Sequence, residues 1–135
     1  MFKWIAAYLG MIVFMFVIDL VWLNVISKSI YQQGIGHLMA AEPNLICAGL
    51  FYLVYVLGLL WFAIRPNYTL IGIKHVFVAG ALVGFLVYAS YDLTNLALLK
   101  DWPLGLSIMD ISWGTLLSGI SASVGKIIFD RSNVG

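Results

Sequence analysis

Residues 4–27 read WIAAYLGMIVFMFVIDLVWLNVIS, an apolar stretch interrupted by one charged side chain, that of Asp19. A helix needs roughly 20 apolar residues to cross the hydrocarbon core of a bilayer, so this stretch is long enough to span a membrane. A cleaved signal peptide is a poor alternative, because the stretch is too long, contains an aspartate and lacks a small-residue cleavage site. The sequence therefore predicts a first membrane-spanning helix over residues 4–27.

Three further segments have the same character, over residues 45–64, 75–99 and 104–125. Of the 135 residues, 63% are hydrophobic and 10% are charged, whereas soluble domains carry about 25% charged residues. We therefore predict an all-α integral membrane protein whose main partner is the lipid bilayer. Residues 1–135 are expected to form one membrane domain, a bundle of four transmembrane helices.

Basic residues are unevenly distributed between the two sides of such a bundle. The amino end, the second loop and the carboxyl end share one side, which holds Lys3, Arg65, Lys74, Lys126 and Arg131. The other side holds Lys28 and Lys100. Because basic residues accumulate in cytoplasmic loops, this distribution predicts that both termini are cytoplasmic.

The loops differ in length and in expected role. Residues 100–103, Lys-Asp-Trp-Pro, are few enough to predict a tight turn, which makes the last two helices an antiparallel hairpin. Residues 28–44 form the longest loop. We expect this loop to lie on the outer surface, to be partly helical and to cover whatever lies beneath it.

Three aspartates interrupt the apolar segments: Asp19, Asp92 and Asp110. Each lies eight or nine residues from the outer end of its helix, a depth of roughly 12 Å at a rise of 1.5 Å per residue. A carboxylate in hydrocarbon costs at least about 2.5 kcal/mol, and such a residue is by default a candidate for function. The sequence therefore predicts a polar site in the outer half of the bundle.

Six neighbours at or near helical spacing join these aspartates, because residues three or four apart share a helix face. Residues 19–22 and 110–113 both place a tryptophan three residues after the aspartate. The candidate site residues are Asp19, Asp92, Asp110, Asn95, Tyr88, Trp22, Trp113, Asn24 and Ser107.

Small residues recur at helical spacing in the last two spans. Gly80 and Gly84 form a small-xxx-small pattern, which predicts a helix contact or dimerisation. The last span carries a longer stripe of small and polar residues: Ser107, Asp110, Gly114, Ser118, Ser121 and Gly125. This stripe has two explanations, close packing of helices or the lining of a narrow polar path.

Three aspartates in a space of low dielectric need compensation by protons, a cation or basic groups. The residues predict no buried lysine, arginine or histidine at that depth. Either Lys28 and Lys100 extend down from the outer surface and His37 folds down from the first loop, or a proton, a hard metal cation or an amine-bearing substrate neutralises the aspartates. Asp92 and Asp110, joined by the short hairpin, are the best candidates for a pair that shares a proton. The alternative is that each aspartate only fixes packing by accepting hydrogen bonds from tryptophan, tyrosine or serine on a neighbouring helix.

Other chemistry has little support in the sequence. The net charge of +1 argues against a nucleic-acid partner. The single cysteine, Cys47, excludes an internal disulfide and a CxxC motif. His37 and His75 are predicted on opposite sides of the membrane, so they form no metal pair within one chain. We assign no metal site, no cofactor and no catalytic residue.

Three stretches, YDLTN at residues 91–95, LKDWP at 99–103 and DISWG at 110–114, together with Asp19 and Trp22, resemble a known family. It is the DUF2177 family of small predicted bacterial membrane proteins of unknown function. The resemblance covers nearly the whole chain. It implies a four-helix protein of the bacterial inner membrane, and it implies no activity.

Three functions fit these residues. The first is a small transporter or channel, in which a proton or hard cation binds the aspartates; four helices are few for a permeation path, so a homo-oligomer is expected. The second is a membrane-embedded enzyme or accessory of lipid or fatty-acid metabolism, with the aspartates acting near the headgroups. The third is a non-catalytic partner subunit of another membrane protein.

Overall fold

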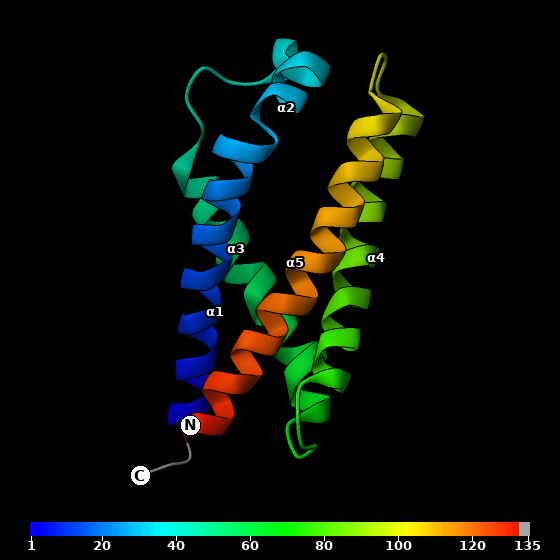
Figure 1. The fold of residues 1–135 in the computed structure, drawn as a ribbon. Coiled ribbons are helices and arrows are strands. Elements are labelled where there is room, and N and C mark those ends of the chain that lie inside the picture. Colours follow the sequence, from blue (N-terminus) through cyan, green and yellow to red (C-terminus); the bar gives the residue numbers. More distant parts are fainter. Residues whose placement is uncertain (133–135) are drawn as a thin grey trace.

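Four long helices dominate the computed structural model, which describes residues 1–132. They are α1 (Phe2–Val21, continued by a π-helical turn to Ile26), α3 (Leu45–Leu59, continued by irregular turns to Asn67), α4 (Lys74–Leu98) and α5 (Leu104–Arg131). All four are long and apolar enough to cross a membrane, so the predicted architecture of four spans is confirmed. The helices alternate in direction, and the start of α1 therefore lies beside the end of α5 (Figure 1).

The helices α4 and α5 form the predicted antiparallel hairpin, joined by a turn in which Asp101 has a positive φ of 63°. They make the most extensive helix pair in the fold. The pair is close because α4 presents glycines to it: a Cβ atom on Gly84 would lie 2.5 Å from the carbonyl oxygen of Gly114. Gly80 faces α5 in the same way, against Ser118. The small-xxx-small pattern of α4 therefore serves a helix contact inside the chain.

From Gly114 to Gly125, the stripe of small residues on α5 packs closely against the neighbouring helices. A Cβ atom on Gly114 would overlap the ring of Tyr88, and one on Gly125 would lie 2.5 Å from the sulfur of Met11. Between them, the Ser118 hydroxyl is hydrogen-bonded to that of Tyr55. Of the two explanations for the stripe, the structure therefore shows close packing for its part from Gly114 to Gly125.

The helix α5 continues to Arg131, six residues beyond the predicted end at residue 125. The sequence places Lys126 just beyond the predicted last span, but its side chain is buried inside the bundle. Its ammonium group donates to the carboxylate of Asp130 one turn later, at 2.7 and 2.5 Å. This ion pair compensates the charge, so the helix continues through the lysine instead of ending before it.

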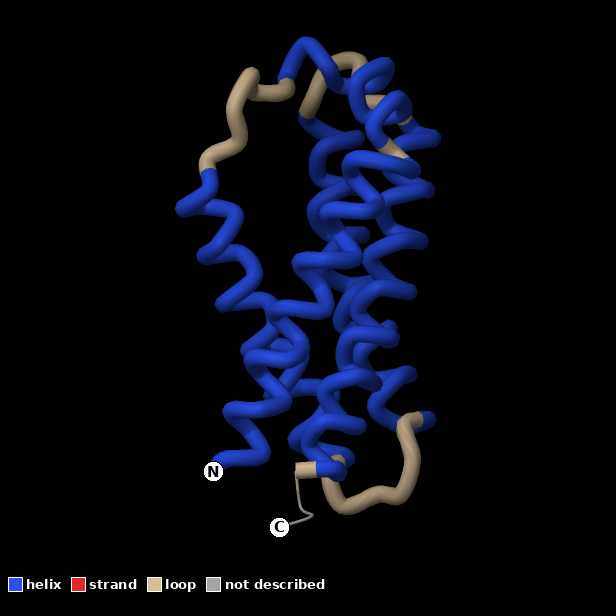
Figure 2. The backbone as a smooth tube through the Cα atoms, turned by 60° about the vertical axis from the view of Figure 1, so that its left-hand side comes forward, coloured by secondary structure: helices blue, strands red, loops and turns tan. Residues whose placement is uncertain are grey.

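The helix α3 diverges from the other three helices towards its amino end (Figure 2). Leu45 and Ile46 at that end are 78% and 77% exposed, whereas Leu59 near the other end is fully buried. The bundle is therefore tight at the end that carries the termini and open between α3 and α4 at the opposite end. We call this opposite end, which carries the loop of residues 28–44 and the turn at Asp101, the α2 end.

The short helix α2 (Lys28–Ile35) lies across the α2 end (Figure 1). It is followed by a single 3₁₀ turn over Gly36–Leu38. A Cβ atom on Gly34 would lie 3.0 Å from the ring of Pro103, so α2 packs directly on the start of α5. The prediction that this loop is partly helical is confirmed, and its position on the outer surface of the membrane stays a prediction.

Candidate functional site

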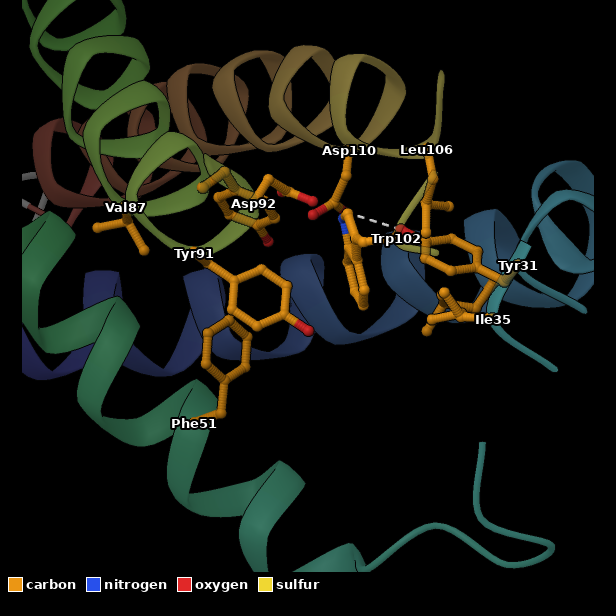
Figure 3. Close-up of a pocket in the computed structure, with 11 residues that line it drawn as sticks. Tyr31, Ile35, Phe51, Val87, Tyr91, Asp92, Trp102, Leu106 and Asp110 are labelled. Carbon is orange, nitrogen blue, oxygen red and sulfur yellow. Dashed lines mark hydrogen bonds between the residues drawn. The ribbon is translucent and has the colours of Figure 1, made fainter. Parts of the chain in front are cut away.

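The carboxyl groups of Asp92 on α4 and Asp110 on α5 point towards each other beneath α2 (Figure 3). The tight turn at Asp101 sets this arrangement, because it places the two aspartates at the same height on neighbouring antiparallel helices. Asp110 accepts a hydrogen bond of 2.7 Å from the hydroxyl of Tyr31 on α2. The structure thus brings together the two residues that the sequence paired.

The side chain of Asp92 is fully buried. Neither of its carboxylate oxygens has a hydrogen-bond partner among residues 1–132. A buried charge without a partner is costly, and a group in this position takes up a proton or is paired with a cation. Asp92 is therefore the polar group in the site that most requires a partner from outside the chain.

Asp19 on α1 has a different environment. Its two oxygens accept hydrogen bonds from the Tyr52 hydroxyl at 2.8 Å and the Trp113 indole N–H at 3.2 Å. The Trp113 ring is stacked on that of Trp22, with centroids 4.2 Å apart. This aspartate fits the alternative in which an intramembrane carboxyl fixes the packing of neighbouring helices.

A cavity of about 450 Å³ lies between the carboxyl pair and α2. Aromatic side chains make up much of its wall, and none of the described residues that line it is basic. The lining residues are Leu23, Tyr31, Ile35, Phe51, Val87, Tyr88, Tyr91, Asp92, Trp102, Leu106 and Asp110 (Figure 3). A smaller cavity of about 230 Å³ shares Tyr31, Tyr88 and Asp110 with it and extends to Asp19. All three predicted aspartates therefore border adjoining spaces.

Tyr31 connects the covering helix α2 to the site. Burial raises the pKa of its hydroxyl well above the ordinary value, and the hydrogen bond to Asp110 raises that pKa further. The hydroxyl therefore keeps its proton throughout the physiological range and donates a hydrogen bond to the carboxylate of Asp110. This bond joins α2 to α5 at the wall of the cavity.

An apolar groove of about 540 Å³ runs between α3 and α4. It exists because α3 diverges from α4 towards the α2 end (Figure 2). The groove shares Phe51 and Val87 with the carboxyl-bearing cavity, so the two spaces adjoin at these residues. Its other lining residues are Cys47, Leu50, Val54, Tyr55, Gly58, Phe62 and Val83.

The remaining predicted residues differ in their placement. Tyr88 lines both cavities, and buried Ser107 accepts a hydrogen bond of 2.8 Å from the Trp102 indole. Asn24 donates to the carbonyl of Leu20 on its own helix and is exposed. Asn95 lies on α4 but is not among the residues that line the described cavities. The structure thus places Tyr88 in the walls of both cavities and Ser107 behind the wall residue Trp102, whereas the two asparagines do not line the cavities.

Sequence reasoning missed the tyrosines that donate to the aspartates. Tyr52 lies in the span that carries no charged residue, so no nearby carboxylate in the sequence indicates a partner for its hydroxyl. Tyr31 lies in the longest loop, whose fold the sequence did not fix. One signal was available, because an intramembrane carboxylate needs hydrogen-bond donors and tyrosine hydroxyls are among the few donors in these apolar segments.

Metal ligation gains no support from this geometry. Within residues 1–132, no three histidine, cysteine, aspartate or glutamate side chains gather closely enough to hold a metal ion. Lys28, Lys100 and His37, which the sequence offered as compensating groups, are all exposed. The one ion pair formed within the described chain is that of Lys126 and Asp130, at the opposite end of the bundle.

Comparison with known proteins places the chain in a family. No curated protein and no solved structure matches it. A family model described as "Predicted membrane protein (DUF2177)" matches residues 4–127. This range includes all four spans up to the last turns of α5, together with both aspartates of the facing pair. The chain therefore belongs to the DUF2177 family of predicted membrane proteins.

Proposed function

We propose that the protein binds an amphiphilic molecule of the membrane, with its polar part at Asp92 and Asp110 and its apolar part between α3 and α4. The observation that carries this proposal is that the cavity and the groove adjoin at Phe51 and Val87. One end of the combined space offers carboxyl groups, and the other offers hydrocarbon side chains. A ligand with a polar head and a single apolar chain matches both ends.

The groove faces the hydrocarbon of the bilayer. Val54 and Phe62 on its α3 wall are 71% and 63% exposed on the surface of the bundle, which lipid would contact. A lipid-like ligand therefore enters sideways from the membrane, where such molecules are concentrated, and its chain leaves hydrocarbon for a hydrocarbon-lined site. Affinity must then come from the fit of the chain and above all from the polar end.

The carboxyl groups at the polar end of the space are buried. Asp92 is fully buried, and α2 lies over the cavity, where Tyr31 bonds to Asp110. Electrostatic and hydrogen-bonding interactions gain strength in such a site because water does not compete for them. The site therefore supports recognition of one polar group more than it supports passage of solvated ions.

Proton-coupled transport is a second candidate, and the facing pair of Asp92 and Asp110 is the observation that favours it. Two such carboxyl groups cannot both be charged without compensation, so the pair exchanges protons as a unit. A route across the membrane would have to open the α5 seam, where Gly125 packs against Met11. In liposomes loaded with a pH-sensitive dye, proton flux that Asp92→Asn abolishes would support this candidate.

The location of the protein is proposed on the sequence alone. The resemblance to the family implies a multi-pass protein of the bacterial inner membrane, and the distribution of lysine and arginine favours cytoplasmic termini. The site would then open within the outer leaflet, beneath α2.

Photolabelling in lipid nanodiscs tests the proposed function. The probes are a long-chain alcohol and a long-chain amine of equal length, each with a diazirine in the chain. Labelled residues are mapped by mass spectrometry. The proposal predicts that at least one probe concentrates on the groove walls, around Phe51 on α3 and Val83 on α4, and that an excess of the same compound without diazirine competes.

Two tryptophan substitutions on α4 provide the matched comparison. Val87→Trp fills the junction of groove and cavity, so labelling of the groove should fall. Leu86→Trp adds the same ring at a 64% exposed position that is not among the groove's lining residues, so labelling should persist. Equal labelling of the groove and of exposed α1 residues such as Val13, unaffected by Val87→Trp, would contradict the proposal.

A further inference from the structure

We infer that the polar part of this ligand is a primary ammonium group, which binds between Asp92 and Asp110. The inference rests on the proposed function and adds the chemical class of the ligand, an amphiphile with one cationic amine head and an apolar chain. It follows from the charge of the cavity, the hydrogen-bonding capacity of its walls and the aromatic side chains around it.

The charge in the cavity is of one sign. Asp92 and Asp110 both line it, and Asp19 borders the adjoining space. None of the described lining residues is a lysine, arginine or histidine. An anionic head such as a phosphate or a fatty acid carboxylate would therefore face two carboxyl groups without a counter-charge, whereas a cation compensates them.

The hydrogen-bonding capacity of the walls favours a cation that carries N–H groups. Both oxygens of Asp92 lack a donor among residues 1–132, and Asp110 receives one donor, from Tyr31. An ionised carboxylate has about four acceptor sites, and a primary ammonium has three donors. Its head can therefore bond both carboxyl groups, which a quaternary ammonium cannot do.

Aromatic rings complete the environment of a cation. Tyr31, Phe51, Tyr91 and Trp102 all line the cavity (Figure 3). The rings of Tyr91 and Trp102 are in edge-to-face contact, with centroids 6.1 Å apart. The faces of aromatic rings attract cations, and aromatic walls are used repeatedly to bind ammonium ligands. An ammonium head is the group to which both the carboxyl pair and these walls are complementary.

The position of the head also gives the direction of the chain. Phe51 and Val87 line both the cavity and the groove, and the groove extends away from the α2 end to Phe62. With its head at the carboxyl pair, a ligand therefore has its chain directed towards the middle of the bilayer. This is the orientation that a membrane amphiphile already has in the leaflet on the α2 side.

The test compares the diazirine-bearing amine and alcohol in nanodiscs of uncharged lipid at neutral pH, where the amine is protonated. We expect the amine to label the groove more strongly than the alcohol by on the order of tenfold, because it adds charge-assisted hydrogen bonds. Dodecylamine should compete with the probe. Dodecanol, dodecanoate and dodecyltrimethylammonium should compete much less.

Two asparagine variants separate the site from general surface charge. Asp92→Asn preserves the shape of the side chain and removes the buried charge, so the preference for the amine should disappear while the alcohol labels as before. Asp101→Asn removes the same charge from the exposed turn at the same end of the bundle, and the preference should remain. Thermal unfolding of each variant confirms that it is folded.

The outcomes distinguish this inference from the proposed function. If alcohol and amine label the groove equally and Asp92→Asn changes neither, the ammonium assignment is wrong while the groove remains a ligand site. Competition by dodecyltrimethylammonium as strong as that by dodecylamine would overturn the assignment to a primary amine. If neither probe concentrates in the groove, the proposed function itself fails.

Discussion

The indole rings of Trp22 and Trp113 stack in parallel, with centroids 4.2 Å apart and an angle of 3° between their planes. They connect α1 to α5 one turn from Asp19, and they differ in one respect. The Trp113 N–H donates to Asp19 at 3.2 Å, whereas the buried Trp22 N–H has no partner among residues 1–132. The two tryptophans therefore contribute similar ring contacts, but only Trp113 adds a hydrogen bond.

This difference predicts unequal effects of two similar substitutions. Trp113→Phe removes a donor from a carboxylate as well as part of the stack, so we expect it to reduce the free energy of unfolding by about 2–3 kcal/mol. Trp22→Phe removes only ring area and an unpartnered N–H, and its cost should be smaller. Thermal unfolding in detergent, followed by the remaining tryptophan fluorescence, measures both. Equal losses would show that the bond to Asp19 adds no stability.

Asp92 and Asp19 are predicted to respond in opposite directions to the same substitution. In ligand-free protein, Asp92→Asn removes a buried group whose oxygens lack donors, so the thermal midpoint should be unchanged or higher. The Asp19 carboxylate accepts hydrogen bonds from Tyr52 and Trp113. The amide of Asp19→Asn would direct its own N–H groups at one of these two donors, so the midpoint should fall. A clear fall for Asp92→Asn would mean that the carboxyl group has a stabilising partner in the protein.

The facing carboxyl pair was predictable because it depends on local geometry. A four-residue turn makes the flanking helices antiparallel, so residues at equal distance from the turn lie at equal height, as Asp92 and Asp110 do. The neighbours at helical spacing were less predictable. Tyr88 reaches the cavity, whereas Asn95, on the same predicted face, does not line it. Spacing defines a face of a helix, but the packing of neighbouring helices decides which part of that face borders a space.

The groove and the covering contact were not predictable, because both depend on tertiary packing. The helix α3 carries no charged residue, so no charged face indicates which way it leans, and its divergence from α4 creates the groove. The bond from Tyr31 to Asp110 depends on where α2 rests, which Gly34 sets by packing against Pro103. Hydrophobic patterning gives the spans of a membrane protein but not the spaces between them.

Gly84 should tolerate no side chain. A Cβ atom there would lie 2.5 Å from the Gly114 carbonyl oxygen, which is backbone and cannot move aside without shifting α5. We expect Gly84→Ala to destabilise the fold by about 1–3 kcal/mol through overpacking. Gly49→Ala on α3 is the control, since no described residue comes within 4 Å of its added Cβ. The control should be neutral or slightly stabilising, because alanine favours helix. Equal midpoints for both variants would argue against the close α4–α5 seam.

Tyr31 is predicted to hold α2 over the cavity. Tyr31→Phe keeps the ring and removes the donor to Asp110, so backbone amides of α2 should exchange hydrogen several-fold faster, while those of α4 are unchanged. Because burial and this bond raise the pKa of Tyr31, the hydroxyl remains protonated in mild alkali, and the difference from the parent should persist at pH 9. Tyr91→Phe, which also lines the cavity, is the control. Identical exchange of α2 in parent and Tyr31→Phe would show that other contacts hold the helix in place.

The orientation of the bundle is the last prediction, and a single-cysteine label tests it. Cys47 is exposed near the α2 end, so it is first replaced by alanine, and cysteine is then introduced as Asp101→Cys in the exposed turn or as Arg131→Cys at the end of α5. The distribution of basic residues predicts cytoplasmic termini. In intact bacterial spheroplasts, a membrane-impermeant maleimide should therefore label Asp101→Cys and reach Arg131→Cys only after lysis. The reverse pattern would place the α2 end, and with it the carboxyl pair, in the cytoplasmic leaflet, so the ligand would be drawn from the lipids of that leaflet instead.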